Sequence, residues 1–304
     1  MVSKVVIPHL FEIKTRASNI YGFTLFDLSG HQKNPAFQLN DNYPKPSKTY
    51  FYEISKDINL PKKFEAIYRW YLLSDQKIYY QRPIIKNFSF KLRYDLHFNR
   101  LTVSPAYHHL IRFELGNIWP PGKILANFIA DDLQKLGFGA FHGIALKFKN
   151  KVVCVFAPGG NFKTPLLKAA MAQGAEYISG DKIIIKDGDV YFLPPLKSDE
   201  ISINCEKITA YKYKITHVFF IFRSGNATCQ HLKNSARINS YLNVFNLFNF
   251  LGTGWALNFR RMIDTDKFTN DWYNFLNLRR VRNIKLIKEE NFSDLINLFL
   301  KELA

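Results

Sequence analysis

The stretch that decides the fold is Phe141–Pro195, which reads FHGIALKFKNKVVCVFAPGGNFKTPLLKAAMAQGAEYISGDKIIIKDGDVYFLPP. Two apolar runs, at 140–148 and 151–156, are joined by a short polar turn, which predicts a β-hairpin. A second pair of runs, at 183–186 and 190–193, flanks an Asp-Gly turn and predicts another hairpin. The segment between the two hairpins carries the residues that point to a function.

The first hairpin leads into the loop Ala157–Thr164, which reads APGGNFKT. A phosphate-binding loop needs glycines for close backbone approach, a lysine for the outer phosphates and a Ser or Thr hydroxyl for Mg²⁺. The Lys163-Thr164 end and the strand-to-helix setting agree with the pattern G-x-x-x-x-G-K-[ST]. Ala157 and Phe162 depart from it, because they replace the two outer glycines. The alternative interpretation is a tight turn in which Lys163 is merely solvated.

A short helix is expected over 164–173, and Gly174 suits the left-handed position after its end. The strand-like residues 177–179 then lead to Asp181. A carboxylate there would hold Mg²⁺, directly or through water, or accept the proton of an attacking hydroxyl. The alternative for Asp181 is an ordinary surface residue at the end of a strand.

The order of these features resembles the HPr kinase/phosphorylase family, and more broadly the P-loop kinases that share the phosphoenolpyruvate carboxykinase fold. The features are His142-Gly143, a hairpin, a Gly-rich loop ending in Lys-Thr, a helix closing on Gly174-Ala175, and a strand followed by an Asp. The resemblance covers residues 141–197. Weaker similarity extends to Asn19–Phe23 and to 123–136.

The resemblance implies an ATP or GTP site formed by Gly159, Gly160, Asn161, Phe162, Lys163 and Thr164. It implies Mg²⁺ at Thr164 with help from Asp181, and it places His142 on the phosphate side of the site. The family commonly has two adjacent acids after the helix, one for metal and one as the base. This chain has Gly180-Asp181-Lys182, so one acid of the pair is missing.

Arg223 and His142 each have a functional interpretation and a structural one. Arg223 follows an apolar run at 215–222 that is expected to be a buried strand, and it is a candidate second cation for the transferred phosphoryl group. An ordinary surface arginine is the alternative. His142 taken alone is a structural histidine as readily as a functional one.

Composition bounds the class of protein. The chain has 304 residues, 47% of them hydrophobic, with 28 Phe and 16 Tyr, which allows a sizeable core. Three widely spaced cysteines argue against a disulfide framework or a Cys-based zinc site and favour a reducing compartment. The sequence has no apolar run of transmembrane length and no secretory signal pattern at its start, so we expect a cytoplasmic protein without a membrane span.

We therefore expect a mixed α/β protein with a β-rich domain at 1–120 and an HPr kinase-like nucleotide-binding domain at 121–304. The first domain would either gate the acceptor site or make contacts in a homo-oligomer. Its expected β-rich runs are 5–7, 20–26, 50–54 and 79–98, and His97–Arg100 is expected to turn a hairpin between two such runs. The expected helices are 123–136, one that begins near Ile238, and 291–303.

Three functions fit the sequence. The first is a Mg²⁺-dependent kinase that transfers the γ-phosphoryl group of ATP or GTP to a hydroxyl of a protein serine, a sugar or a small molecule. The second is a catalytically degenerate regulatory or scaffold protein of the same fold. The third is binding of a polyanion, suggested by the net charge of +17 and the basic run Arg279–Lys288, for which a solvated amphipathic face is the alternative.

Overall fold

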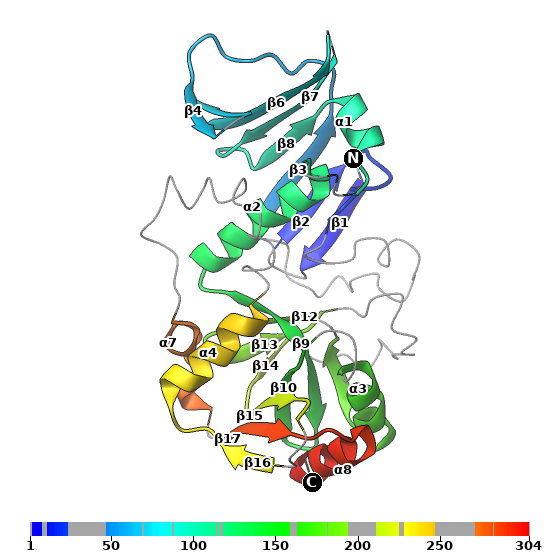
Figure 1. The fold of residues 1–304 in the computed structure, drawn as a ribbon, viewed down its shortest axis with the longest axis vertical. Helices are drawn as coiled ribbons and strands as arrows, with labels where there is room; N and C mark the ends of the chain where they lie inside the picture. Colours follow the sequence, from blue (N-terminus) through cyan, green and yellow to red (C-terminus); the bar gives the residue numbers. More distant parts are fainter. Residues whose placement is uncertain are drawn as a thin grey trace. The chain divides into compact units, whose positions relative to one another are not determined.

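The computed structural model describes residues 2–7, 11–23, 47–68, 70–86, 88–113, 115, 118–158, 163–180, 182–193, 211–224, 228–246, 271–281 and 283–303. The protein is a mixed α/β chain, as expected (Figure 1). Its residues form two compact units that divide within one helix, between Ile129 and Ala130. Each unit is described by itself.

The first unit is built on an eight-stranded sheet in the order β1-β2-β3-β8-β7-β6-β5-β4. Its pairs are antiparallel except for β2 with β3 and β3 with β8, which are parallel. The predicted turn at His97–Arg100 joins β7 to β8, with Asn99 at a φ of 50°. The strands are β1 (Val2–Ile7), β2 (Phe11–Thr15), β3 (Lys48–Ile54), β4 (Glu65–Tyr68), β5 (Tyr71–Ser74), β6 (Lys77–Ile85), β7 (Phe88–Asp95) and β8 (Arg100–Val103).

The strand predicted at 20–26 is wrong in its described part, because residues 20–23 form a turn. Gly22 has a φ of 72°, and a Cβ at this position would lie 2.3 Å from the Cβ of Pro120. The carbonyl of Tyr21 accepts a hydrogen bond of 2.9 Å from the amide of Gly122 at the start of α2 (Pro121–Lys135). Packing against that helix therefore overrides the β propensity of the apolar side chains.

Aromatic side chains fill the core of the first unit. The helix α1 (Pro105–Leu110) places Tyr107 fully inside, where its ring stacks on Phe90 with centroids 5.3 Å apart. The Tyr107 hydroxyl donates a hydrogen bond of 2.7 Å to the carbonyl oxygen of Trp119. Further along the sheet, Phe128 of α2 stacks on Tyr94. Because a buried hydroxyl must find a partner, the bond to Trp119 fixes α1 against the chain that enters α2.

We predict that Tyr107→Phe lowers the free energy of unfolding by about 1–3 kcal/mol, because the buried carbonyl of Trp119 loses its donor. Chemical denaturation measures the change. The matched control is Tyr79→Phe in β6, whose hydroxyl has no partner among the described residues and whose loss should cost less than about 0.5 kcal/mol. Equal effects of the two substitutions would show that the hydrogen bond from Tyr107 to Trp119 does not contribute to stability.

The second unit is built on a sheet in the order β14-β13-β12-β9-β10-β15-β17-β16, with β11 also paired to β9. The strands β10, β15 and β17 are parallel to one another, and β9 runs antiparallel to β10. Its elements after α2 are β9 (Gly139–Phe148), β10 (Lys151–Phe156), α3 (Lys163–Ala172), β11 (Glu176–Ser179), β12 (Lys182–Lys186), β13 (Asp189–Tyr191), β14 (Lys212–Lys214), β15 (His217–Phe222), β16 (Thr228–His231), α4 (Ser235–Phe245), α7 (Trp272–Phe275), η7 (Leu278–Arg280), β17 (Asn283–Lys288) and α8 (Phe292–Leu303).

Both predicted hairpins of the second unit are confirmed, as are the predicted helices within its described residues. The hairpin turns contain Lys149 with a φ of 53° and Asp187 with a φ of 52°. Gly137 and Gly174, with φ of 87° and 90°, end α2 and α3 as expected. Turn residues and apolar periodicity are therefore sufficient to predict these hairpins and helices of the second unit.

Aromatic contacts attach helices to both faces of the second sheet. On one face, Phe245 of α4 packs on Phe156 and Phe220, and Trp272 of α7 packs edge-on against Phe141. On the other face, Phe299 of α8 packs edge-on against Phe219. The helices α3 and α8 contact each other (Figure 1). The sheet is thus a central layer between two helical layers.

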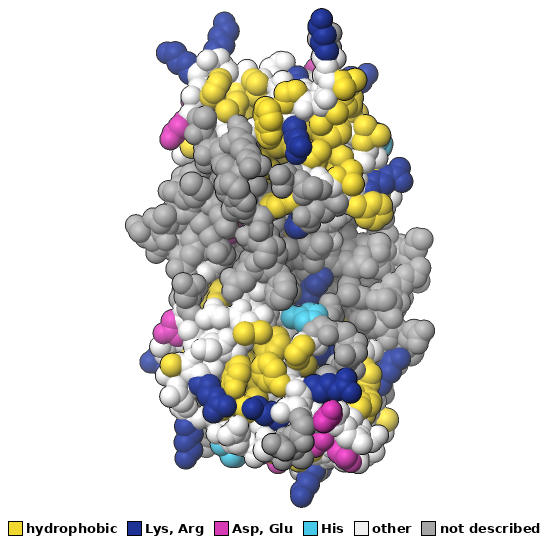
Figure 2. Space-filling view, viewed as in Figure 1, with side chains coloured by type: hydrophobic (Ala, Val, Ile, Leu, Met, Phe, Trp, Pro, Cys, Tyr) yellow, Lys and Arg dark blue, Asp and Glu magenta, His cyan; other side chains and the backbone are white. Residues whose placement is uncertain are grey.

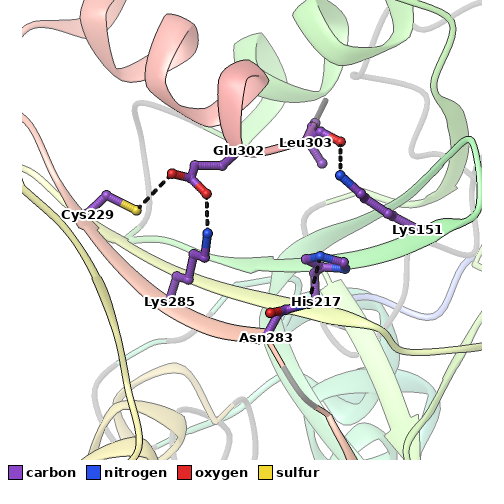
Figure 3. Close-up of polar contacts among 7 residues, drawn as sticks. All are labelled: Lys151, His217, Cys229, Asn283, Lys285, Glu302 and Leu303. Carbon is purple, nitrogen blue, oxygen red and sulfur yellow. Dashed lines mark hydrogen bonds and ion pairs between the residues drawn. The ribbon is translucent and has the colours of Figure 1, made fainter.

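Polar contacts hold α8 at the amino ends of the parallel strands (Figure 3). The ammonium of Lys151 donates a hydrogen bond of 2.6 Å to the carbonyl oxygen of Leu303, and Lys285 forms an ion pair with Glu302. Cations at the last turn of a helix also oppose its negative dipole end. These contacts support α3 indirectly, because α8 packs against it.

His217 lies among these groups, with its Nε2 3.1 Å from Asn283 Nδ2 (Figure 3). Its Nδ1 is 2.8 Å from Thr216 Oγ1. Burial, and then the charges of Lys151 and Lys285, lower the pKa of His217 below its ordinary value. The unfolded chain therefore takes up a proton at a higher pH than the folded protein does. The stability linked to His217 is fully present above its unfolded pKa and is lost as pH falls.

We predict that the free energy of unfolding falls as pH decreases from about 7 to about 5, and that His217→Gln makes this dependence shallower. Denaturation midpoints measured across the pH range test this. The exposed Gln230 provides the control, because Gln230→Ala removes no ionisable group and should leave the slope as in the wild type. An unchanged slope in His217→Gln would show that this imidazole does not control the transition.

Candidate functional site

The candidate site is the place where β10 passes into α3. Residues 153–156 of β10 are fully buried between β9 and β15, and Ala157 is buried after them. The loop 159–162 lies outside the described residues, so the predicted contacts of Gly159, Gly160, Asn161 and Phe162 stay predictions. The chain is described again from Lys163, the first residue of α3.

Sequence explains why α3 begins and docks where it does. Pro165 lies in the first turn, where a backbone N–H has no partner within the helix and its absence costs nothing. Leu166, Leu167 and Ala170 are buried and attach one side of α3 to the sheet. The first turn contains no acidic residue. The positive end of the helix dipole is therefore not neutralised by the helix itself.

Lys163 is the central residue of the site. Its side chain is only 6% exposed, and its ammonium lies 2.7 Å from Nε2 of His142. The ammonium also donates to the carbonyl oxygens of Ala157 at 3.3 Å and Pro158 at 3.1 Å. A buried charge is tolerated only when it is paired or hydrogen-bonded, and these three acceptors meet that need.

The contact with Lys163 also constrains His142. An ammonium has only donors, so a charged Lys163 requires Nε2 of His142 to accept, which is the role of that nitrogen in a neutral imidazole with its proton on Nδ1. The neighbouring Gly143 lies close to β10, where a Cβ would come within 2.6 Å of the carbonyl oxygen of Val155. Local packing therefore explains the pair His142-Gly143. Gly143 allows β9 and β10 to approach closely, and the side chain of His142 contacts Lys163.

The residues present fit a phosphate group. A buried cation at the start of a ten-residue helix without first-turn acids favours an anion there. Thr164 is exposed in the same turn, so its hydroxyl is accessible to a hydrated Mg²⁺. Asp181 lies outside the described residues, and its predicted contribution to Mg²⁺ binding stays a prediction.

The remaining candidate cations do not contact Lys163 or His142 among the described residues. Arg223 is exposed just beyond β15, at the same edge of the sheet as the end of β10, and it has no contact with Lys163 or His142 among the described residues. The basic run Arg279–Lys288 is divided. Arg279 and Arg280 are exposed in η7, whereas β17 is paired on both sides and Lys285 is bound to Glu302.

Strand pairing adds a residue that spacing alone does not bring to the site. Lys182 of β12 is the direct cross-strand partner of His142 of β9. The sequence shows Lys182 beside Asp181, but its position next to His142 depends on the register of β12 against β9. On the face drawn in Figure 2, the described Lys and Arg side chains outnumber the Asp and Glu side chains, in keeping with the net charge of +17.

Comparisons with known proteins give little further information. No protein-family model matches the chain, and no curated protein matches it. Among solved structures, the HPr(Ser) kinase/phosphatase from Coxiella burnetii matches with 11% identity over 42% of this chain and 94% of that chain, at a TM-score of 0.23. That score is too low to support a conclusion about the site. None of the described helices is both long and apolar enough to cross a membrane.

We predict that His142→Ala lowers the free energy of unfolding by about 1–3 kcal/mol, because the buried ammonium of Lys163 loses one acceptor. His142→Gln should recover part of the loss, since its amide oxygen can accept. In the double variant His142→Ala/Lys163→Met the two losses should be less than additive. Denaturation curves measure each change, with exposed His231→Ala as the control. Strict additivity would show that the two side chains are not coupled.

Proposed function

We propose that this chain is a nucleotide-dependent kinase that transfers the γ-phosphoryl group of ATP or GTP to a hydroxyl. The observation that carries the proposal is the buried ammonium of Lys163 at the start of α3, the helix that follows the central strand β10 in the chain. Ligands of open α/β sheets bind outside the carboxyl ends of such strands. The acceptor would be a protein serine, a sugar or a small molecule.

The proposed roles follow from the chemistry of each side chain. Lys163 would hold the outer phosphates, aided by the loop amides of residues 159–162 and the first turn of α3. Thr164 and Asp181 would hold Mg²⁺, which neutralises charge on the phosphates when it is bound. Asp181 could instead accept the proton of the acceptor hydroxyl. His142 would position Lys163 through the hydrogen bond between them.

A second function is a nucleotide-binding regulatory or scaffold protein that has lost catalysis. Three features favour it. Ala157 and Phe162 replace glycines of the strict loop pattern, and Gly180-Asp181-Lys182 lacks one acid of the pair that the resemblance implies. Positioning and charge neutralisation supply most of the catalysis in phosphoryl transfer, so loss of one acid weakens turnover more than binding. Binding and transfer must therefore be measured separately.

We predict Mg²⁺-dependent binding of ATP or GTP to the wild type and at least a tenfold loss of affinity in Lys163→Ala, because the charge facing the outer phosphates is removed. Isothermal titration calorimetry with and without Mg²⁺ measures this. The exposed Lys168, on the same helix, provides the control, and Lys168→Ala should bind as the wild type does.

The outcomes separate the two functions. Transfer to any hydroxyl acceptor that Asp181→Asn abolishes, with nucleotide binding retained, supports the kinase. Nucleotide binding without transfer to any acceptor supports the regulatory module. No binding at millimolar nucleotide would refute both, and the site at α3 would then have no nucleotide role.

A further inference from the structure

The hairpin formed by β6 and β7 extends past its neighbours in the first sheet. Among the described residues, β5 pairs with Lys77–Tyr80 of β6, and β8 pairs with Leu92–Asp95 of β7. The pairing of β6 with β7 continues beyond these ranges to Ile85 and Phe88. The end of the hairpin is therefore a two-stranded projection, and such a projection needs support from outside the sheet.

The helix α1 supplies that support at the base of the projection. The amide of Ser104 donates a hydrogen bond of 2.9 Å to the carbonyl oxygen of Lys91, and the amide of Lys91 donates one of 3.2 Å to the Ser104 hydroxyl. Tyr107 then stacks on Phe90, and Phe88 packs edge-on against Phe90 with centroids 5.6 Å apart. Aromatic contacts with α1 thus hold the hairpin in place.

Two adjacent isoleucines lie at the tip of the projection. Ile84 is 42% exposed and Ile85 is 70% exposed, although isoleucine is among the residues most often buried. The register shifts between Pro83 and Ile85, and a bulge of this kind re-aims side chains. Trp70 is 44% exposed beside the hairpin, because its carbonyl oxygen accepts a 3.1 Å hydrogen bond from the amide of Gln81. We call Trp70, Ile84 and Ile85 the apolar tip.

The end of α1 presents the same kinds of side chain. Leu110 is 60% exposed and Phe113 is 78% exposed, and Arg112 between them in the sequence is exposed as well. Glu114, which follows, lies outside the described residues. On the hairpin, the exposed Lys86 directly follows the apolar tip. A group of exposed apolar side chains marks a binding surface, whereas a single one does not.

Size and charge favour a lipid surface as the occupant of the apolar tip. A stable protein interface takes about 800 Å² from each partner, more than three partly exposed side chains at a hairpin end provide. A second copy of the chain would also carry a net charge of +17 and would be repelled. Large apolar side chains with Lys and Arg beside them bind membranes through apolar burial and through attraction to anionic lipids.

We propose that the apolar tip inserts into the surface of a membrane that contains anionic lipids. Leu110 and Phe113 add apolar contact from the segment that packs on the same hairpin, and Lys86 and Arg112 face the phosphate groups of the lipids. The contact is peripheral and involves no covalent step. It does not depend on the proposed kinase function, because these residues belong to the first unit and Lys163 belongs to the second.

Co-sedimentation of the full chain with vesicles tests the proposal. One set of vesicles is phosphatidylcholine alone, and the other contains about 30% phosphatidylserine. The wild type should bind the anionic vesicles at least tenfold more strongly than the neutral ones, and raising the salt concentration should weaken this binding. Quenching of tryptophan fluorescence by brominated lipids should accompany binding and should decrease in Trp70→Phe, since Trp70 enters the lipid.

The double variant Ile84→Asn/Ile85→Asn should weaken binding to the anionic vesicles at least tenfold, because the inserted apolar surface is lost. Phe98→Ser is the matched control. Phe98 is 58% exposed in the turn between β7 and β8, at the opposite end of β7, and its substitution should change binding less than twofold. Circular dichroism establishes that both variants are folded.

The cations are tested by charge reversal. Lys86→Glu should weaken binding to the anionic vesicles at least fivefold, since it replaces attraction by repulsion at the lipid surface. Lys63→Glu makes the same change in net charge at an exposed position before β4, at the end of that strand away from Trp70. It should weaken binding less than twofold, because the effect of Lys86 is local.

Three outcomes would overturn the inference. The first is that the folded wild type does not bind anionic vesicles. The second is that binding survives in Ile84→Asn/Ile85→Asn, which would place the contact on another basic surface. The third is a wild type that is dimeric by light scattering and becomes monomeric in the isoleucine variant without binding vesicles, which would show that the tip meets a second copy. Nucleotide affinity is measured separately, and none of these results changes the kinase proposal.

Discussion

The structure of the second unit depends on how the buried ammonium of Lys163 is satisfied. Among its partners are His142 of β9 and the carbonyl oxygens of Ala157 and Pro158, just beyond β10, so these contacts require the two strands to pair in their observed register. A one-residue slip would move His142 to the other face of the sheet and leave the charge without one of its acceptors. The same contacts that make the site therefore also select the register of the strands around it.

The residues at the two ends of the parallel strands make different kinds of contact. Near the carboxyl end of β10, the buried ammonium of Lys163 is held by His142 and by the carbonyl oxygens of Ala157 and Pro158. At the amino ends, Lys285 is paired with Glu302 and Lys151 with the end of α8 (Figure 3). The contacts of Lys285 and Lys151 stabilise the helical layer, whereas Lys163 lies at the end of the sheet where open α/β sheets bind ligands.

The first unit has a different basis. Its sheet relies on aromatic rings, and some of its buried Tyr hydroxyls have specific hydrogen-bond partners, as Tyr107 has in the carbonyl of Trp119 and Tyr52 in His108. These bonds join residues far apart in the chain. A Tyr-rich core is more selective about its partners than an aliphatic one, because each mismatched hydroxyl costs free energy.

Sequence by itself determined the mixed α/β class, the two hairpins and the helix ends at Gly137 and Gly174, because turn residues and apolar periodicity act over a few neighbouring positions. It also placed Lys163 at the start of a helix. It failed at residues 20–23, where Gly22 packs against Pro120, and it could not place Lys182 beside His142. The division of the run 279–288 between an exposed turn and a paired strand was likewise decided in three dimensions. Only the tertiary structure decides these three features, because they depend on strand register and on contacts between segments that are distant in the sequence. Local propensity contains no information about either.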